Sequence, residues 1–426
     1  MKNLKRIFLY AGLLLLIFSF AACKPKQQTT QQVSQGPKGN LEVLTPAVGI
    51  VSTILSDINN SFAAAYPDIH VEYASLGGDY ENTMKVKMAS NQLPDVFGTH
   101  GWAKLRYAEY LMDLQDQPWA KNIDPTIRSL VTIGDKVLTL PIDSYRSGLV
   151  YSVKILQDYG IEVPGTTSEL EQAFETVKQK SNGSITGLYI GGSDNWMYGS
   201  YINTSATPLT VTAPVNDGEA LKNGTYDWNK FLPIPTKLLE YYNKGYINKD
   251  CLTSNFSDAV KALAENKCAF IMIGPDIIPS AQEINPDFKG GIMPIPAVFP
   301  GDTPAFQGGE MNSWGVWKDT QNAEAAKLYL QFAARPENVT KICQATSSPA
   351  GITTVQPDLG DLAQYWNKYS KNPVVPMWDR EYMPNGMWDV MSVAAQELMS
   401  GSMNAQGFVD QMKSEYIRLR AVAAAQ

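Results

Sequence analysis

The chain has 426 residues, a formal net charge of −7 at neutral pH, four cysteines and two histidines. Residues 1–22 carry three positive charges and no negative charge, so residues 23–426 carry −10, which disfavours nucleic acid and anionic surfaces as partners. So few histidines, without a cysteine cluster, argue against a transition-metal site, and no metal or cofactor is expected.

The first 40 residues predict an export signal followed by a tether. A charged start leads into the apolar run 7–20, which is shorter than the roughly 20 residues of a membrane-spanning helix. Two alanines come next, an order typical of a signal peptide over residues 1–22. Cys23 resembles the lipobox cysteine of bacterial lipoproteins, so we expect an acyl chain such as palmitate to anchor it to the cell membrane, facing the outside or the periplasm. Cleavage elsewhere, with Cys23 incidental, is the alternative. Residues 23–40 are polar and predict a flexible tether.

Strands and helices alternate after the tether. Apolar residues at helical spacing, for example Ile54, Ile58 and Phe62, indicate a helix that ends before Pro67. Such alternation predicts an α/β fold with a mainly parallel sheet, whose ligands bind at the loops beyond the strand ends. The expected strands are 41–45, 69–73 and 92–97, and the expected helices are 50–66, 79–88 and 102–114.

Residues 140–152 contain a break between two apolar runs. Pro141 follows the first run, the polar residues 143–147 come next, and residues 148–151 form the second run. We interpret this segment as a strand that leaves one sheet and enters another, with 143–147 crossing between two lobes. An ordinary strand-loop-strand inside one domain is the alternative.

The α/β rhythm then resumes and continues to the C-terminus. Ser168 or Thr167 is the expected cap of the helix that follows the crossing. Cys251, Cys268 and Cys343 either include one bridged pair or are three buried thiols. The expected helices are 167–180, 235–244, 256–265, 323–334, 391–399 and 405–420, and the expected strands are 185–190, 268–273 and 291–296.

Five motifs in this order resemble the extracellular solute-binding proteins of ABC importers, the group called family 1, which mostly bind carbohydrates. The resemblance runs nearly end to end after Cys23. Tyr151-Ser152-Val153 departs from it, because the family usually has Tyr-Asn-Lys there. The motifs lie at residues 62–71, 93–114, 135–164, 264–274 and 308–332.

The resemblance implies a two-lobed clamp of the periplasmic-binding-protein type, in which each lobe is a mainly parallel sheet flanked by helices. Three hinge crossings are implied, near residues 143–147, 293–297 and 324–331. Lobe one would comprise residues 41–144 plus 295–326, and lobe two residues 147–293 plus 330–426. A ligand that contacts both lobes would favour the closed form, which the membrane permease recognises.

The same resemblance assigns particular positions. Compared with the maltodextrin-binding members, Tyr145 corresponds to a sugar contact on the crossing strand and Trp388 to a stacking tryptophan. Trp102 corresponds to a carboxylate and Asp276 to another stacking tryptophan, so two of those contacts are not kept. These exchanges argue against maltodextrin itself as the ligand.

Residue chemistry points to similar loops. Because a sugar has apolar faces and hydroxyl edges, its sites combine aromatic rings with planar polar groups. Other roles remain open: Trp102 as a cap against the core, Arg146 as an ion-pair partner of Asp143, and His100 as a plain hydrogen-bond donor. The segment with Trp378 and Asp379 reads more as a connector. The expected ligand-binding residues are His100, Trp102, Asp143, Tyr145, Arg146, Asp194, Asn195, Trp196, Gly309, Glu310, Asn312 and Trp388.

Three functions compete. The favoured one is a monomeric sugar-binding lipoprotein that delivers a sugar or oligosaccharide to an ABC permease and is not an enzyme. The second is the same fold with a polyol, a polyamine or a phosphorylated solute. The third is a secreted glycosidase, for which Glu310 and Asp389 could supply the two carboxyl groups.

Overall fold

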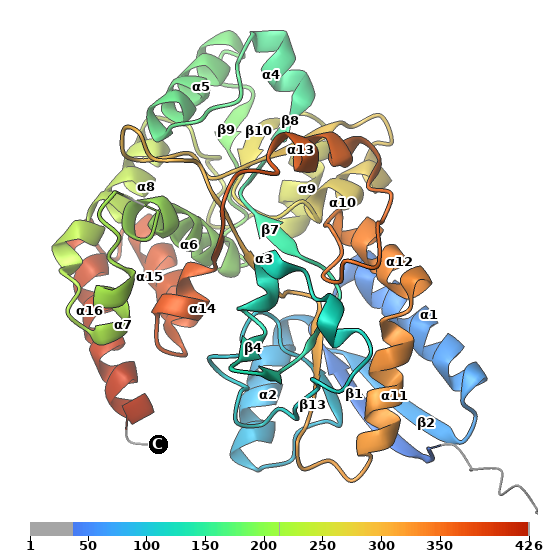
Figure 1. Cartoon of the computed structure of the whole chain (residues 1–426). Coiled ribbons are helices and arrows are strands. Elements are labelled where there is room, and N and C mark those ends of the chain that lie inside the picture. The colour runs from blue at the N-terminus through green and yellow to red at the C-terminus, as the bar shows by residue number, and fades with distance from the viewer. Residues whose placement is uncertain (1–36, 213, 425–426) are drawn as a thin grey trace, which may run out of the picture. The chain divides into compact units, whose positions relative to one another are not determined.

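The computed structural model describes residues 37–212 and 214–424 (Figure 1). Everything below concerns these described residues. The predicted signal peptide and Cys23 therefore lie outside the described residues. Within the described part, no helix has the length and apolar content needed to cross a membrane.

The first sheet contains five strands in the order β2-β1-β3-β13-β6. Helix α1, Gly49–Ala65, packs on it through Leu55, Ile58 and Phe62, which recur at helical spacing and are buried. Its core also takes residues from α11, Ala323–Ala333, and α12, Pro336–Thr346. The strands are β1 Gly39–Thr45, β2 Ile69–Ser75, β3 Val96–Gly98, β6 Leu140–Pro141 and β13 Ser313–Val316.

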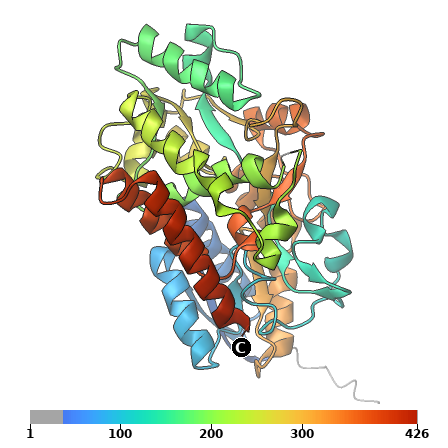
Figure 2. The same cartoon turned by 90° about the vertical axis from the view of Figure 1, so that its left-hand side faces the viewer.

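The second sheet contains four strands in the order β11-β8-β10-β9 and is surrounded by most of the remaining helices. The helix α5, Thr167–Lys180, is capped by Thr166, whose hydroxyl accepts from the Glu169 amide, so the cap predicted at residue 167 or 168 is wrong by one or two positions. The C-terminal helix α16, Ala405–Ala424, packs on α15, Met387–Met399 (Figures 1 and 2). The strands are β8 Leu149–Ser152, β9 Thr186–Leu188, β10 Cys268–Ile271 and β11 Gly290–Met293.

Each sheet holds one reversed strand. In the first sheet β13 runs antiparallel to both of its neighbours, β3 and β6, and in the second sheet β8 runs antiparallel to β10 and β11. The other strands of each sheet run in one direction. The mainly parallel α/β architecture predicted from the sequence is therefore confirmed, with one antiparallel insertion in each sheet.

A third, three-stranded sheet links the other two, in the order β14 (Val374–Pro376), β12 (Phe306–Gly309) and β7 (Tyr145–Ser147). The chain passes from β6 through β7 to β8, which confirms that the strand around residue 145 leaves one sheet and enters another. Gly148 stands between β7 and β8, where a Cβ would lie 2.2 Å from the Met293 carbonyl oxygen. Only glycine therefore fits this passage without a shift of backbone.

The helix predicted over residues 102–114 does not form. The backbone there makes turns with mixed hydrogen bonds, from Arg106 N to Trp102 O, from Tyr107 N to the same oxygen, and from Tyr110 N to Tyr107 O. Lys136 Nζ donates a hydrogen bond to the carbonyl oxygen of Leu111. Leu111 also forms an isolated β-bridge with Trp317, beside the first sheet. These tertiary partners replace the regular helical bonds that the spacing of apolar residues indicated.

The third passage between the cores comes later than expected. Six residues of α11 and then Val339, Ile342 and Val355 belong to the core of the first sheet, whereas Leu362 is the first later residue in the core of the second. By core membership the passage therefore lies between residues 355 and 362, whereas the resemblance implied 324–331 and a start of lobe two at residue 330. The amphipathic face of α11 lies against the first sheet along its whole length, so it leaves no room for a crossing there.

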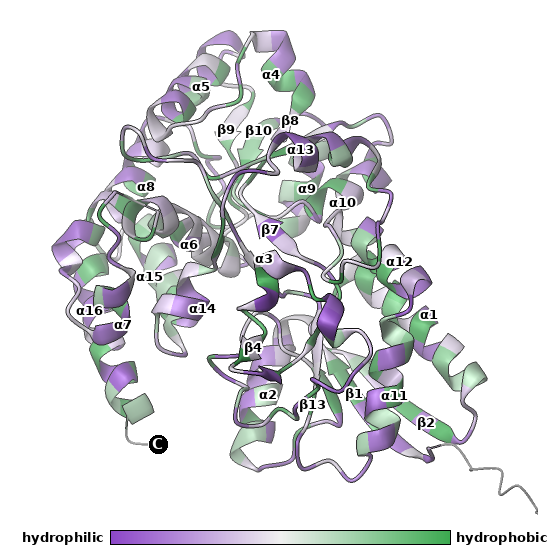
Figure 3. Cartoon of the chain, in the orientation of Figure 1, coloured by the Kyte–Doolittle hydropathy of each residue, from purple (hydrophilic) through white to green (hydrophobic). Residues whose placement is uncertain are grey.

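Helix surfaces and thiols agree with simple burial rules. Polar and apolar residues alternate along α5 and α16 (Figure 3), and α16 buries Phe408, Met412 and Tyr416 at a spacing of four. Cys251, Cys268 and Cys343 are all free and buried, so among the described residues the buried-thiol alternative is the correct one.

Candidate functional site

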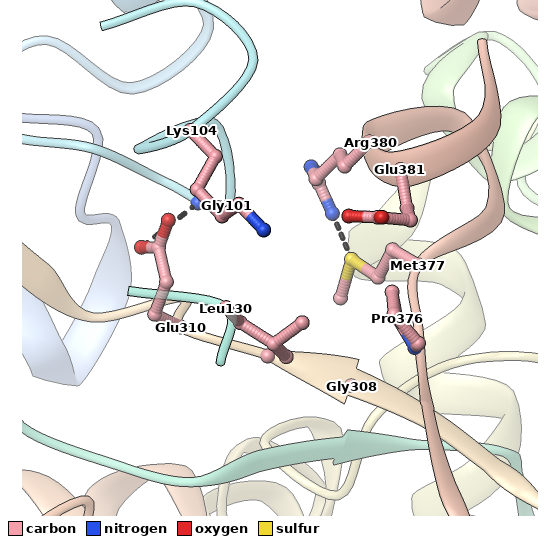
Figure 4. A pocket seen from close by; sticks show the side chains of 10 residues that line it. Gly101, Lys104, Leu130, Gly308, Glu310, Pro376, Met377, Arg380 and Glu381 are labelled. Atoms are coloured by element: carbon pink, nitrogen blue, oxygen red, sulfur yellow. Dashed lines mark hydrogen bonds between the residues drawn. The ribbon is translucent and has the colours of Figure 1, made fainter. Parts of the chain in front are cut away.

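A pocket lies where loops of the first sheet, the linking sheet and α14 (Trp378–Tyr382) meet. It contains about 350 Å³ of space free of protein atoms, part of which is open to solvent. Figure 4 shows Lys104 and Glu310 on one side of this space, with Arg380, Glu381 and Met377 facing them. The lining residues are Gly101, Lys104, Leu130, Gly308, Gly309, Glu310, Pro376, Met377, Arg380 and Glu381.

Trp102 follows the pocket residue Gly101 and contacts two arginines. The guanidinium carbons of Arg106 and Arg380 each lie 4.1 Å from the ring centroid. Trp102 is only 4% exposed, and it belongs to a small core cluster rather than to a helix cap. Trp102 therefore has two favourable cation–π contacts, one from each arginine.

Glu310 holds the loop that carries Trp102. It follows β12 and is 2% exposed, and its carboxylate accepts from the Thr99 hydroxyl at 2.7 Å, the Gly101 amide at 3.1 Å and the Ala103 amide at 3.0 Å. The Ser313 hydroxyl donates to it as well. Burial raises the pKa of Glu310 despite these donors. Four protein donors already occupy its carboxylate, so Glu310 positions the loop more than it offers itself to a ligand.

A polar chain runs from Glu81 on α2 (Tyr80–Ala89) toward the C-terminal segment. His100 Nδ1 lies 3.0 Å from Glu81 Oε1, and Arg106 pairs with the second oxygen of the same carboxylate. Burial opposes ionisation of Glu81, but the hydrogen bond from His100 and the Arg106 charge lower its pKa. Arg106 Nε also donates to Asn385 Oδ1 at 3.0 Å, which joins the loop of the first sheet to the segment before α15.

Asp379 is a buried carboxylate without a hydrogen-bond donor. The residue is 3% exposed, and neither of its carboxylate oxygens has a hydrogen-bonding partner among the described residues. Its nearest cation is Arg380, whose Nε lies 3.9 Å from Oδ2, and burial raises the pKa of Asp379. A buried carboxylate costs free energy unless it is paired, so this group is suited to accept hydroxyl donors from a ligand.

Trp388 lies on α15 between the two cores. Its ring packs against Gly199 of α6 (Trp196–Thr210) and contacts both the second core and the small cluster around Trp102. The guanidinium of Arg380 lies 5.6 Å from its centroid. Next to it, Asp389 pairs with Lys85 of α2 at 3.0 Å. Trp102 and Trp388 are therefore brought together around Arg380.

The residues of the crossing strand divide into two groups. Tyr145 is buried, and its hydroxyl donates to Asp276 Oδ1 at 3.4 Å. Arg146 projects elsewhere, with its guanidinium 5.8 Å from the Trp366 centroid, and it has no carboxylate within ion-pair distance among the described residues. Asp143 is fully buried and accepts from Asn312 Nδ2 at 2.7 Å. The suggested Asp143–Arg146 ion pair therefore does not form.

Asp143 gives the fold a specific pH dependence. Burial raises the pKa of Asp143 to about 6. Because the folded pKa exceeds that of the unfolded chain, the native state binds more protons between about pH 4 and pH 6, so stability falls as pH rises through that window.

We expect Asp143→Asn to remove part of this pH dependence, because the amide cannot titrate and its oxygen can still accept from Asn312. The wild type should lose about 2–3 kcal/mol more stability than the variant between pH 4 and pH 7. Urea unfolding of both proteins at several pH values measures the difference. Parallel curves for the two proteins would contradict it.

The Asp194–Trp196 loop does not join the other predicted site residues. Asp194 Oδ2 accepts from the Phe256 amide at 2.8 Å, and the Trp196 ring lies 5.5 Å from the Phe256 ring. Both residues thus support the junction of α6 with α9, Phe256–Ala264. Asn195 is the exposed N-cap residue of α6. None of these three residues lines the pocket.

Sequence reasoning missed the charged residues around Trp102. Arg106 and Arg380 were not predicted, and Asp379 was set aside as part of a connector. The adjacent order Trp378-Asp379-Arg380 was the available signal, since Trp378 is fully buried and so holds its neighbours in place. No group of three or more potential metal ligands occurs in residues 37–212 and 214–424.

Comparison with known proteins gives a consistent result. The family described as bacterial extracellular solute-binding protein matches residues 49–340. The melibiose/raffinose/stachyose-binding protein MelE of Bacillus subtilis is 40% identical over 362 residues, which cover 84% of this chain and 85% of MelE.

Solved structures show the same fold. A sugar transporter protein of Bacillus licheniformis in complex with stachyose superposes with a TM-score of 0.85 at 38% identity, covering 89% of this chain and 100% of that one. A putative binding protein of Bacillus subtilis in an open conformation has a TM-score of 0.83 at 37% identity, with 91% and 99% of the two chains covered.

Proposed function

The chain belongs to the bacterial extracellular solute-binding protein family, and from this premise we propose that it captures a sugar between two lobes and delivers it to an ABC permease. Sugars of the melibiose, raffinose and stachyose group are the first candidates, because a relative with 40% identity is named for them. A relative with 38% identity was solved in complex with stachyose.

One observation carries the proposal for the site. Two tryptophans, Trp102 and Trp388, converge on Arg380 beside a pocket, and the unpartnered carboxylate of Asp379 is adjacent. Aromatic rings suit the apolar faces of a sugar, while arginine and carboxylate groups suit its hydroxyls. We assign ligand contact to these four residues. Of the other predicted site residues, Tyr145 and His100 remain proposed contacts, and Glu310 and Asn312 are proposed to hold the site in place.

Closure would follow from the division between the cores. Lobe one would comprise residues 41–144 and 295–355, and lobe two residues 147–293 and 360–424, with β7 and β12 between them. A ligand held by Trp102 of lobe one and Arg380 of lobe two makes its full contacts only when the lobes are together. It therefore shifts the population toward that state, which the permease binds.

The finer expectations fit this role. We propose that residues 1–22 are removed, that lipid on Cys23 anchors the protein outside the cell, and that it acts as a monomer without catalysis. A glycosidase would need two carboxyl groups that flank the glycosidic bond it cleaves. Here Glu310 accepts hydrogen bonds from four protein donors, and Asp389 pairs with Lys85 on the surface. That alternative is therefore not favoured.

Melting temperature measured against a sugar panel tests the function. We expect raffinose, stachyose or melibiose to stabilise residues 37–426, by about 2.7 kcal/mol at a concentration a hundred times the dissociation constant. Maltose and maltotriose serve as control sugars for raffinose, stachyose and melibiose. Sorbitol, spermidine and glycerol phosphate represent the non-sugar alternative.

Chromatography of the sugar after incubation completes the test. Recovery of intact sugar with a melting shift supports a receptor. Cleaved sugar would support the glycosidase, and a shift with only a polyol, polyamine or phosphorylated compound would replace the sugar proposal.

A further inference from the structure

Two contacts between the lobes lie outside the sugar pocket. Arg106 Nε in lobe one donates to Asn385 Oδ1 in lobe two at 3.0 Å. Lys85 Nζ on α2 lies 3.0 Å from Asp389 Oδ2 on α15. The partners are 279 and 304 residues apart in the chain, and none of the four residues lines the pocket. Both contacts therefore need no ligand, and they exist only while the lobes are together.

Arg106 is held in place for Asn385 by its own lobe. Its side chain is 5% exposed, pairs with the carboxylate of Glu81, and lies 4.1 Å from the centroid of the Trp102 ring. Because these partners all belong to lobe one, they orient the guanidinium whether or not lobe two is close. Forming the hydrogen bond to Asn385 therefore costs little further ordering of Arg106. The charge on the donor also makes this bond stronger than one between neutral groups.

The Lys85–Asp389 pair is weaker and is sensitive to salt. The two side chains are 42% and 65% exposed, so water and dissolved ions screen their attraction. A neutral sugar has no charge of its own for salt to screen. A fall of sugar affinity with rising ionic strength would therefore come from charged contacts within the protein, such as this pair.

We propose that Asn385 and the Lys85–Asp389 pair set the sugar affinity by holding the lobes together, without touching the sugar. The inference rests on the proposed function, because it concerns closure around that ligand. When the closed form is the minor state of the unliganded protein, the apparent affinity is proportional to its population. A contact made only in the closed form therefore multiplies the affinity for every sugar by the same factor. A contact with the sugar itself gives a factor that differs between sugars.

Affinities for melibiose, raffinose and stachyose test this difference. In Asn385→Ala all three should fall by one common factor of at least about fivefold, measured by calorimetry on residues 37–426. Asn243→Ala, which truncates an exposed asparagine at the end of α8 (Pro233–Asn243) in lobe two, should leave them unchanged. Undiminished affinity in Asn385→Ala would overturn the inference, as would factors that differ from one sugar to the next.

Reversing the ion pair gives a second test. Lys85→Glu places two carboxylates opposite each other and should weaken sugar binding about threefold at low salt, and Lys85→Glu combined with Asp389→Lys should restore it. Sodium chloride raised from about 0.05 M to about 0.5 M should reduce the difference between Lys85→Glu and wild type. Lys154→Glu disrupts the exposed Lys154–Asp158 pair within lobe two and should not change the affinity. A reversed pair that fails to restore binding would count against the inference.

A distance between the lobes separates failure of this inference from failure of the proposed function. Spin labels can be attached at Ile133→Cys in lobe one and Ile417→Cys in lobe two, which are exposed positions, because the cysteines of residues 37–426 are all buried. Saturating raffinose should change the distance between the labels in wild type and in Asn385→Ala alike. Absence of binding by all three sugars would overturn the proposed function and this inference with it. Sugar binding without any change of distance would overturn the inference alone.

Discussion

Glu310→Ala is expected to lower the free energy of unfolding by about 3 kcal/mol, because it leaves several buried donors without an acceptor. The donors come from the loop 99–103 and from Ser313 of β13, so the carboxylate joins the Trp102 loop to the first sheet. Glu310→Gln should cost less, since one amide oxygen can still accept from part of the set. Urea unfolding followed by tryptophan fluorescence measures both values.

Glu381→Ala is the matched control for that experiment. Glu381 lines the same pocket, but it is partly exposed and pairs with Lys222, so its removal should change stability by less than about 1 kcal/mol. If Glu310→Ala proves no more destabilising than Glu381→Ala, the carboxylate does not hold the loop, and Glu310 becomes available as a direct sugar contact.

Trp102→Ala should weaken sugar binding by at least about thirtyfold, roughly 2 kcal/mol, and Trp388→Ala by at least about tenfold. Trp102 has the larger expected effect because its loss also removes the ring that positions Arg106 and Arg380. Calorimetry with the sugar identified by the melting panel gives both affinities, and the melting temperature of each unliganded variant checks its fold.

Trp196→Ala provides the control for the loss of a large ring. Its side chain packs on Phe256 at the junction of two helices and is not part of the pocket lining. Stability should fall while sugar affinity stays within about twofold of wild type. Equal losses of affinity in all three variants would instead indicate a general effect on folding, and would remove the evidence for a site around Trp102.

Much of the fold could be predicted because the burial of many elements follows a simple period. Helix α1 is an example, with Leu55, Ile58 and Phe62 on one face. Helix α6 was missed because most of its residues are buried and Pro208 lies within it, so no polar face marks it as a helix. The segment 102–114 shows the opposite error. Its apolar spacing is helical, but the backbone of Leu111 bonds to Lys136 and pairs with Trp317 instead.

The candidate site was predictable only in part. Loop composition identified Trp102, and family resemblance identified Trp388, because aromatic residues in polar loops are unusual enough to notice. Arg380 could not be found in this way, since an arginine beside an acidic residue ordinarily predicts a solvated surface pair. Arg146 was grouped with Tyr145 in the prediction, but its guanidinium lies near Trp366 instead. Composition does not tell which face of a crossing strand a side chain occupies.

The reversed strand β13 has a consequence for the order of events during synthesis. It stands between β3 and β6 and pairs Val316 with Val96 and Trp314 with Leu140. Four of the five strands of the first sheet are made by residue 141, yet they cannot form one sheet until residues 313–316 emerge. Closing so long a loop slows folding, and until then β3 and β6 keep open edges. The sheet whose strands are mostly translated first is thus completed after the second sheet, whose last strand ends at Met293.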